Sequence, residues 1–189
     1  MYAFFVIIRF CKVQKRLCFI RGKFMDIRIA GIINESIVDG WGIRYVVFTQ
    51  GCPHGCPGCH NPQTHSFDGG KVIDTEKLLT EFKEDPLLKG ITFSGGEPFM
   101  QPKPLTELAK EVHSLNKDVT CYTGFTYEEI ISSGNQDWLD LLDQVDVLID
   151  GKFILEQKNL KLLFRGSSNQ RIIDVKESRK TGEIKILTK

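Results

Sequence analysis

Three of the six cysteines in this chain stand in the segment Gly51–Asn61, which reads GCPHGCPGCHN. They are Cys52, Cys56 and Cys59, and their spacing is C-x3-C-x2-C. Thiolates are the ligands of iron–sulfur clusters and common ligands of zinc. Because a cluster normally has four cysteine ligands, three cysteines leave one iron free to bind a substrate. The spacing therefore favours a cluster that takes part in chemistry.

Two other interpretations of this segment stay open at this point. Three cysteines with His54, His60 or His65 have the composition of a closed zinc site, which holds a loop together and does no chemistry. A disulfide framework is a further alternative, although the clustering and odd number of the cysteines argue against it.

Length and composition indicate one ordinary globular domain, with 189 residues of which 41% are hydrophobic and 26% charged. The formal net charge is +1, yet residues 1–24 hold six Lys or Arg and no acid, which leaves 19 basic and 24 acidic residues in the rest. This mildly acidic body argues against a nucleic-acid partner, which needs a basic face. Irregularly spaced cysteines without a convincing secretory signal indicate a reducing, cytoplasmic compartment.

Residues 1–24 differ in composition from the rest of the chain. Their apolar run, Tyr2–Ile8, precedes the positive charges, which is the reverse of the order in a signal peptide, and it is too short to span a bilayer. We expect residues 1–24 to be a non-native or disordered extension in which Cys11 and Cys18 have no role. Residues 25–189 then form a single domain without a membrane partner. A basic amphipathic surface anchor is the alternative.

Strand and helix patterns alternate in that domain. Apolar and β-branched runs predict strands at residues 27–33, 43–48, 90–94, 119–122 and 145–149. Apolar residues at helical spacing predict helices from Asp74 or Thr75 to about Lys83, after Pro102, and from a capping box at Thr126 and Glu129 to about residue 142. This α/β order predicts parallel strands joined by right-handed crossovers, and about five of them form a partial, open β/α barrel.

A second motif, Gly95-Gly96-Glu97-Pro98, directly follows the predicted strand 90–94. Two glycines allow a ligand to approach the backbone closely, although a tight turn that ends a strand is the better explanation when the motif is taken alone. The cysteine segment also follows a predicted strand. Since the carboxyl ends of parallel strands meet at one edge of a sheet, we expect both motifs to form one site.

With both motifs in place, the chain resembles the radical S-adenosylmethionine enzymes, in which such a cysteine segment binds a 4Fe-4S cluster and a Gly-Gly-Glu-Pro segment contacts the methionyl end of the cofactor. The resemblance implies that Cys52, Cys56 and Cys59 hold the cluster. It also implies contacts with S-adenosylmethionine at Gly58, His60, Gly95, Gly96, Glu97 and Thr123. Gly58 departs from the pattern, because many members carry an aromatic residue before the last cysteine.

Within that group the chain is similar, over about Ile29–Val175, to the activating proteins of anaerobic ribonucleoside-triphosphate reductases. The segments that carry this similarity are 39–44, 52–61, 94–98, 122–125, 147–153 and 165–174, of which the last is the most diagnostic. The resemblance implies reductive cleavage of S-adenosylmethionine to a 5'-deoxyadenosyl radical, which takes a hydrogen atom from a glycine Cα. The implied partners are the large subunit of the reductase and a flavodoxin-type or other reductant.

Two other functions stay open. One is activation of another glycyl radical enzyme, such as pyruvate formate-lyase, against which the segment Arg165–Arg171 speaks. The other is a non-catalytic iron–sulfur or zinc-stapled module, which would not need Gly95–Pro98. Among single residues, the sequence favours a solvated loop position for His54 and a core position for Cys121. The polar side chains of Arg165–Arg171 can hold a partner's loop or cap the sheet.

Overall fold

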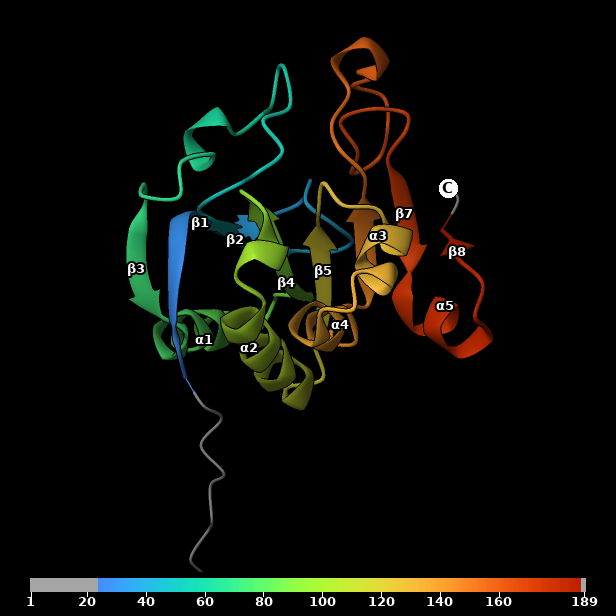
Figure 1. Cartoon of the computed structure of the whole chain (residues 1–189). Helices are drawn as coiled ribbons and strands as arrows, with labels where there is room; N and C mark the ends of the chain where they lie inside the picture. Colours follow the sequence, from blue (N-terminus) through green and yellow to red (C-terminus); the bar gives the residue numbers. More distant parts are fainter. Residues whose placement is uncertain (1–23, 188–189) are drawn as a thin grey trace, which may run out of the picture.

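One mixed β-sheet of eight strands runs through residues 24–187, which are the residues that the computed structural model describes. Its strand order is β3-β1-β2-β4-β5-β6-β7-β8, so β3 and β8 are its two edges (Figure 1). The strands are β1 (Asp26–Ser36), β2 (Arg44–Thr49), β3 (Lys71–Asp74), β4 (Gly90–Gly95), β5 (Asp118–Tyr122), β6 (Val147–Asp150), β7 (Arg171–Asp174) and β8 (Lys185–Ile186). The helices are α1 (Thr75–Glu84), α2 (Pro102–Ser114), α3 (Tyr127–Ser132), α4 (Gln136–Leu142) and α5 (Val175–Thr181).

The centre of the sheet is parallel, whereas its two sides are not. Strands β2, β4, β5 and β6 pair in parallel. On one side β1 pairs antiparallel with β2, and β3 pairs antiparallel with β1. On the other side β7 pairs antiparallel with β6, and β8 pairs antiparallel with β7. Of the five strands predicted to be parallel, four are, and the prediction was wrong for the first, β1. The β1–β2 and β6–β7 connections contain no α-helix, and a parallel pair needs a long crossover whereas an antiparallel pair does not.

The two faces of the parallel strands have different partners because successive side chains point to opposite faces. Tyr45, Val47, Phe93 and Cys121 belong to the hydrophobic core that α1 to α4 complete. On the other face, the buried Arg44 spans three strands at their amino ends: it donates to the hydroxyls of Thr92 at 3.0 Å and Thr120 at 3.1 Å and pairs with Asp118. Farther along this second face, Phe48, Ser94 and Tyr122 line a cavity.

Helices α1 and α3 begin where the sequence predicts, whereas α5 was not predicted. Asp74 caps α1 by accepting from the Glu76 amide, and the predicted capping box of Thr126 and Glu129 is present at α3. The predicted helix beyond α3 is interrupted, because Gly134 has a positive φ of 67° and Asn135 caps a separate helix, α4. Figure 1 shows α1, α2 and α4 at the lower part of the sheet, with the loops after β2 and β6 rising beyond its upper edge.

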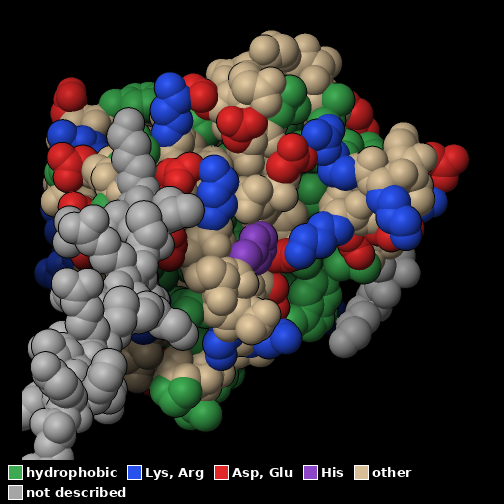
Figure 2. Space-filling model, turned by 90° about the horizontal axis from the view of Figure 1, so that it is seen from below, with side chains coloured by type: hydrophobic (Ala, Val, Ile, Leu, Met, Phe, Trp, Pro, Cys, Tyr) green, Lys and Arg blue, Asp and Glu red, His purple; other side chains and the backbone are tan. Residues whose placement is uncertain are grey.

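The amino-terminal end of the described structure lies at the lower side of the sheet. Phe24 packs against the core, and Met25 exchanges hydrogen bonds with Thr75 at the start of α1. Our expectations for residues 1–24, including Cys11 and Cys18, otherwise fall outside the described residues. Basic and acidic side chains are interspersed across the visible surface at this end (Figure 2). Among the described helices, none combines the length and the apolar character needed to cross a bilayer.

Candidate metal centre

The cysteine loop and the Gly-Gly-Glu-Pro turn meet at the carboxyl edge of the parallel strands, as the sequence predicts. The cysteines follow β2, Gly95 and Gly96 lie at and just beyond the end of β4, and Thr123 follows β5. These segments surround one cavity of about 130 Å³. Of the nine predicted site residues, seven line this cavity: Cys52, Cys56, Cys59, His60, Gly95, Gly96 and Thr123. Gly58 and Glu97 do not line it.

The backbone of the cysteine loop is tied down at both ends. The Gly51 and Cys52 amides donate to Thr64 and His65 carbonyls at 2.8 and 3.1 Å, and the Cys59 amide donates to the Cys56 carbonyl at 3.2 Å. All three cysteines are free thiols and only partly buried. Burial raises the pKa of the Cys52 thiol, and the backbone amide of His54 opposes this rise.

The three thiols suit a group with several metal ions. In an iron–sulfur cluster each cysteine binds a different iron, so three thiols spread around one cavity match its needs. The Asn61 amide donates to the Cys59 sulfur at 3.4 Å, the kind of contact that tunes a cluster's potential. The residues present therefore fit a cluster held by Cys52, Cys56 and Cys59.

The two glycines of the turn are required by packing within the protein. A Cβ atom at Gly95, whose φ is +93°, would lie 2.7 Å from the Phe48 Cα, and one at Gly96 would lie 2.5 Å from the Gly51 carbonyl oxygen. Both positions face the backbone at the end of β2, so the close approach is between two strands. The expectation that these glycines make room for a ligand is thus only part of the explanation. At Gly58 the positive φ of +71° favours glycine, and the nearest atom to a Cβ there belongs to the flexible end of the Leu155 side chain, at 2.9 Å.

Glu97 lies beneath the cavity with 1% of its surface exposed. Its Oε1 accepts from the Thr123 hydroxyl at 2.9 Å and from the Phe99 amide at 3.1 Å. Its Oε2 contacts the His54 Nε2 at 2.7 Å and accepts from the Gly124 amide at 2.8 Å. Glu97 thus joins the cysteine loop to the segment after β5.

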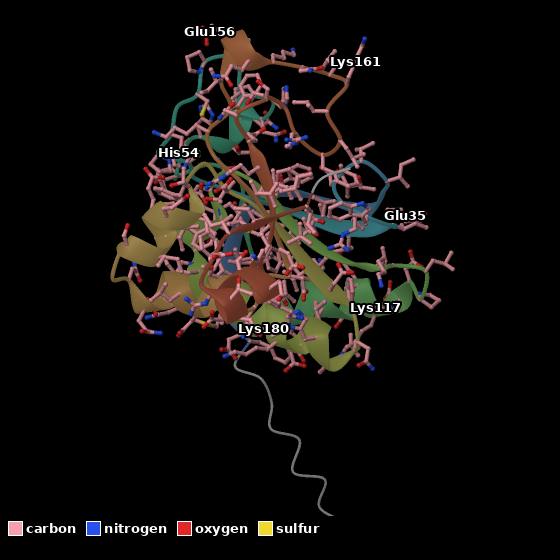
Figure 3. The ribbon with its side chains drawn as sticks, turned by 90° about the vertical axis from the view of Figure 1, so that its right-hand side faces the viewer. Glu35, His54, Lys117, Glu156, Lys161 and Lys180 are labelled. Atoms are coloured by element: carbon pink, nitrogen blue, oxygen red, sulfur yellow. The ribbon has the colours of Figure 1, made fainter. Side chains whose placement is uncertain are left out.

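A larger cavity of about 590 Å³ opens beside the first one, on the face of the sheet that the helices leave uncovered. His60, Asn61, Ser94, Tyr122, Phe153 and Gln170 line both cavities. On its outer side stand Ile37, Val38 and Leu160, which are 77%, 69% and 84% exposed. We call this cavity the apolar groove. Figure 3 shows His54, Glu156 and Lys161 towards the same end of the molecule, away from Lys117 and Lys180.

Comparison with known proteins agrees with this geometry. A family model described as a 4Fe-4S single cluster domain matches residues 38–173. The anaerobic ribonucleoside-triphosphate reductase-activating protein of Haemophilus influenzae is 34% identical over 144 residues, which cover 71% of this chain and 90% of that protein. The protein of the same name from Vibrio cholerae is 37% identical with the same coverage, and that of Enterobacteria phage T4 is 36% identical over 72% of this chain and 87% of its own.

The chain belongs to the family of anaerobic ribonucleoside-triphosphate reductase-activating proteins. The family expected from the sequence is thereby confirmed. Among solved structures, QueE from Escherichia coli matches 54% of each chain with a TM-score of 0.44 and 18% identity, which is too low to show a shared fold.

The segment Arg165–Arg171, the most diagnostic for the family, makes its contacts within this chain and holds its own loop in place. Arg171 contacts the exposed Glu128 and the buried Asp150. Hydrogen bonds to these carboxylates raise the pKa of its guanidinium, and Glu128 has the larger effect. The Asn169 amide nitrogen donates to the Lys152 carbonyl at 2.8 Å, and Arg165 Nη1 donates to the Gln170 carbonyl at 3.1 Å. Of the two roles left open for this run, the contacts support the structural one.

Sequence reasoning placed one histidine wrongly and missed several residues of the cavity wall. His54, expected in solvent, has a side chain that is only 5% exposed. Ser94, Tyr122, Phe153 and Gln170 line the cavity but were not singled out as site residues. Ser94 and Tyr122 could have been found, since each lies at or near the carboxyl end of a predicted strand. Cys121 is fully buried, as predicted.

Proposed function

We propose that this protein is a radical S-adenosylmethionine activase that generates a glycyl radical on the large subunit of an anaerobic ribonucleoside-triphosphate reductase. The observation that carries the proposal is the meeting of the three cysteines with the ends of β4 and β5 around one cavity. When bound, the 4Fe-4S cluster would supply one electron for the cleavage of S-adenosylmethionine to methionine and a 5'-deoxyadenosyl radical, and that radical would take a hydrogen atom from a glycine Cα of the partner.

The chain's own residues hold and orient these groups in the proposal. Cys52, Cys56 and Cys59 bind the cluster, and the polar rim at His60, Gly95, Gly96 and Thr123 positions S-adenosylmethionine beside it. Gly58 and Glu97 lie outside the cavity wall and act by shaping the loop and the turn. This division of work gives the protein a positioning role, while the bound groups supply the reactive chemistry.

The apolar groove supports the proposal that the substrate is a macromolecule. It adjoins the cysteine cavity, and its rim exposes large apolar side chains at Ile37, Val38 and Leu160. Exposed apolar patches with a polar surround mark surfaces that a partner protein covers. A loop that presents glycine suits such a groove because glycine has no side chain to obstruct the approach of its Cα.

Three finer features complete the proposal. The eight-stranded sheet, with helices on one face and the groove on the other, acts as an open, partial barrel whose inner face holds the reaction. A flavodoxin-type or other protein reductant delivers the electron. The compartment is the cytoplasm, where thiols such as those of Cys52, Cys56 and Cys59 stay reduced.

Anaerobic reconstitution tests the proposed chemistry. The reconstituted protein should bind four irons per cluster, and under reduction it should convert S-adenosylmethionine to methionine and 5'-deoxyadenosine. Replacing Cys52, Cys56 or Cys59 by alanine, one at a time, should abolish both, whereas Cys121→Ala should retain the cluster. Retention of zinc in place of iron, or loss of the cluster in Cys121→Ala, would refute the ligand assignment.

A further inference from the structure

His54 stands in the turn between Cys52 and Cys56, and its imidazole is held on three sides. The Nε2 lies 2.7 Å from Glu97 Oε2, and the ring packs edge-on against Phe125 with centroids 4.5 Å apart. A Cβ atom at Gly124 would lie 2.3 Å from the His54 Cδ2, so the ring occupies the space that any other residue there would fill. The surrounding residues therefore form a close-fitting pocket for the imidazole ring.

The direction of the His54–Glu97 hydrogen bond follows from the other partners of Glu97. The Phe99 and Gly124 amides can only donate to the carboxylate. The Thr123 hydroxyl accepts from the Phe125 amide at 3.1 Å and gives its own hydrogen to Glu97. A carboxylate can only accept, so towards Glu97 in that form the His54 Nε2 is the donor.

We propose that His54 is the positioning residue of the cysteine loop. Its side chain links the Cys52–Cys56 turn to Glu97. Glu97 in turn accepts hydrogen bonds from the Gly124 amide and the Thr123 hydroxyl. One imidazole thus holds the loop in place against the ends of β4 and β5.

The same contacts assign Glu97 to the loop. Each of its two oxygens already has two protein partners, and its surface is 1% exposed. A bound ligand would have to displace one of these donors to contact the carboxylate. We therefore assign Glu97 to holding the loop and not to contacting a cofactor. This inference rests on the proposed function in one respect only, namely that the loop it describes binds the cluster.

The test compares matched variants in the metal-free, full-length protein. His54→Gln keeps an N–H donor of similar reach, whereas His54→Phe keeps an aromatic ring and removes the donor. His113→Phe is the control, because His113 Nε2 makes a comparable contact with Asp146 at 2.9 Å, and Asp146 lies just before the amino end of β6. Hydrogen exchange of the amides of residues 52–61 and of Gly124 is followed by mass spectrometry.

His54→Phe should speed exchange of these amides about tenfold or more, the factor expected for one hydrogen bond to a charged group. His54→Gln should stay within about threefold of the unmodified protein, and His113→Phe should leave residues 52–61 unchanged. After reconstitution, His54→Phe should also release iron to a chelator faster than His54→Gln. Equal exchange in all the variants would overturn the proposal.

Glu97→Gln separates the two roles of the carboxylate. The glutamine oxygen can accept from two of the four donors and its amide nitrogen from none, so two of the contacts that hold this side chain in place are lost and the loop should loosen. If Glu97→Gln leaves loop exchange unchanged but weakens binding of S-adenosylmethionine to the reconstituted protein, Glu97 is a ligand contact and our assignment is wrong. Because the exchange experiment needs no cluster and no cofactor, its outcome does not depend on whether the protein is an activase.

Discussion

Arg171 Nε donates to Asp150 Oδ1 at 3.0 Å, and the same guanidinium reaches the exposed carboxylate of Glu128. Asp150 is 1% exposed and also accepts from the Tyr127 amide at 2.8 Å. Arg171 therefore compensates a buried charge at the junction of β6, β7 and α3. Its guanidinium is committed within the chain.

Arg171→Ala should lower the free energy of unfolding by about 3 kcal/mol, because it leaves the Asp150 carboxylate buried without a cation. Urea denaturation of the metal-free protein measures this. The double variant Arg171→Ala/Asp150→Asn should recover part of the loss. If Arg171→Ala is as stable as the unmodified protein but forms less radical on the partner, the side chain serves docking and not the fold.

Gly96→Ala should cost about 3 kcal/mol of stability, because the new Cβ would lie 2.5 Å from the Gly51 carbonyl oxygen and neither backbone can move freely. Gly31 is the matched control. It lies in β1, and nothing lies within 4 Å of its Cβ position. Gly31→Ala should change the free energy of unfolding by less than about 1 kcal/mol. Equal losses in the two variants would show that the close approach at Gly96 is not the cause.

Leu160→Asp should weaken the productive encounter with the reductase, because it places a charge on the rim of the apolar groove. The concentration of large subunit needed for half-maximal radical formation should rise about tenfold, as for one energetically important interface residue. Leu87→Asp is the control, since Leu87 is also highly exposed, at 71%, but lies in the α1–β4 connection. The same rise in both variants would mean that the groove is not the docking surface.

Acid should destabilise the amino end of β6 through Asp146. Burial raises the pKa of this carboxyl, but hydrogen bonds from Lys176, His113 and the Val119 amide outweigh burial and leave the pKa below its ordinary value. A carboxyl whose folded pKa is lowered stabilises the protein above its unfolded pKa of about 3.9 and loses that contribution as the pH falls through the folded pKa. Asp146→Asn should therefore lose stability at pH 7 and show a shallower decline between about pH 5 and 2. If the free energy of unfolding of Asp146→Asn falls as steeply with acid as that of the unmodified protein, the role assigned to Asp146 is wrong.

The sequence predicted the centre of the fold and the meeting of the two motifs at one edge of the sheet. The runs at β2, β4, β5 and β6 are apolar or β-branched and alternate with helical patterns, so the crossover rules place their carboxyl ends together. The cysteine spacing and the Gly-Gly-Glu-Pro turn then had to share one edge. These features depend on neighbouring residues in the chain, which a sequence displays directly.

The sequence did not predict the features that depend on distant partners. Strand β3 has four residues and pairs with β1, and β8 has two and pairs with β7, so neither has a pattern of its own. The burial of His54 depends on Glu97, which is 43 residues away. Nothing in the local sequence distinguishes such a histidine from a solvated one.

The most direct test of the central claim is electron paramagnetic resonance on the proposed partner. The reconstituted protein is mixed anaerobically with a reductant, S-adenosylmethionine and the large subunit of an anaerobic ribonucleoside-triphosphate reductase. A glycyl radical signal on the large subunit, absent when Cys56→Ala replaces the unmodified protein, is the predicted result. A reconstituted cluster that cleaves S-adenosylmethionine but leaves no radical on the reductase, together with a strong radical on pyruvate formate-lyase, would contradict it.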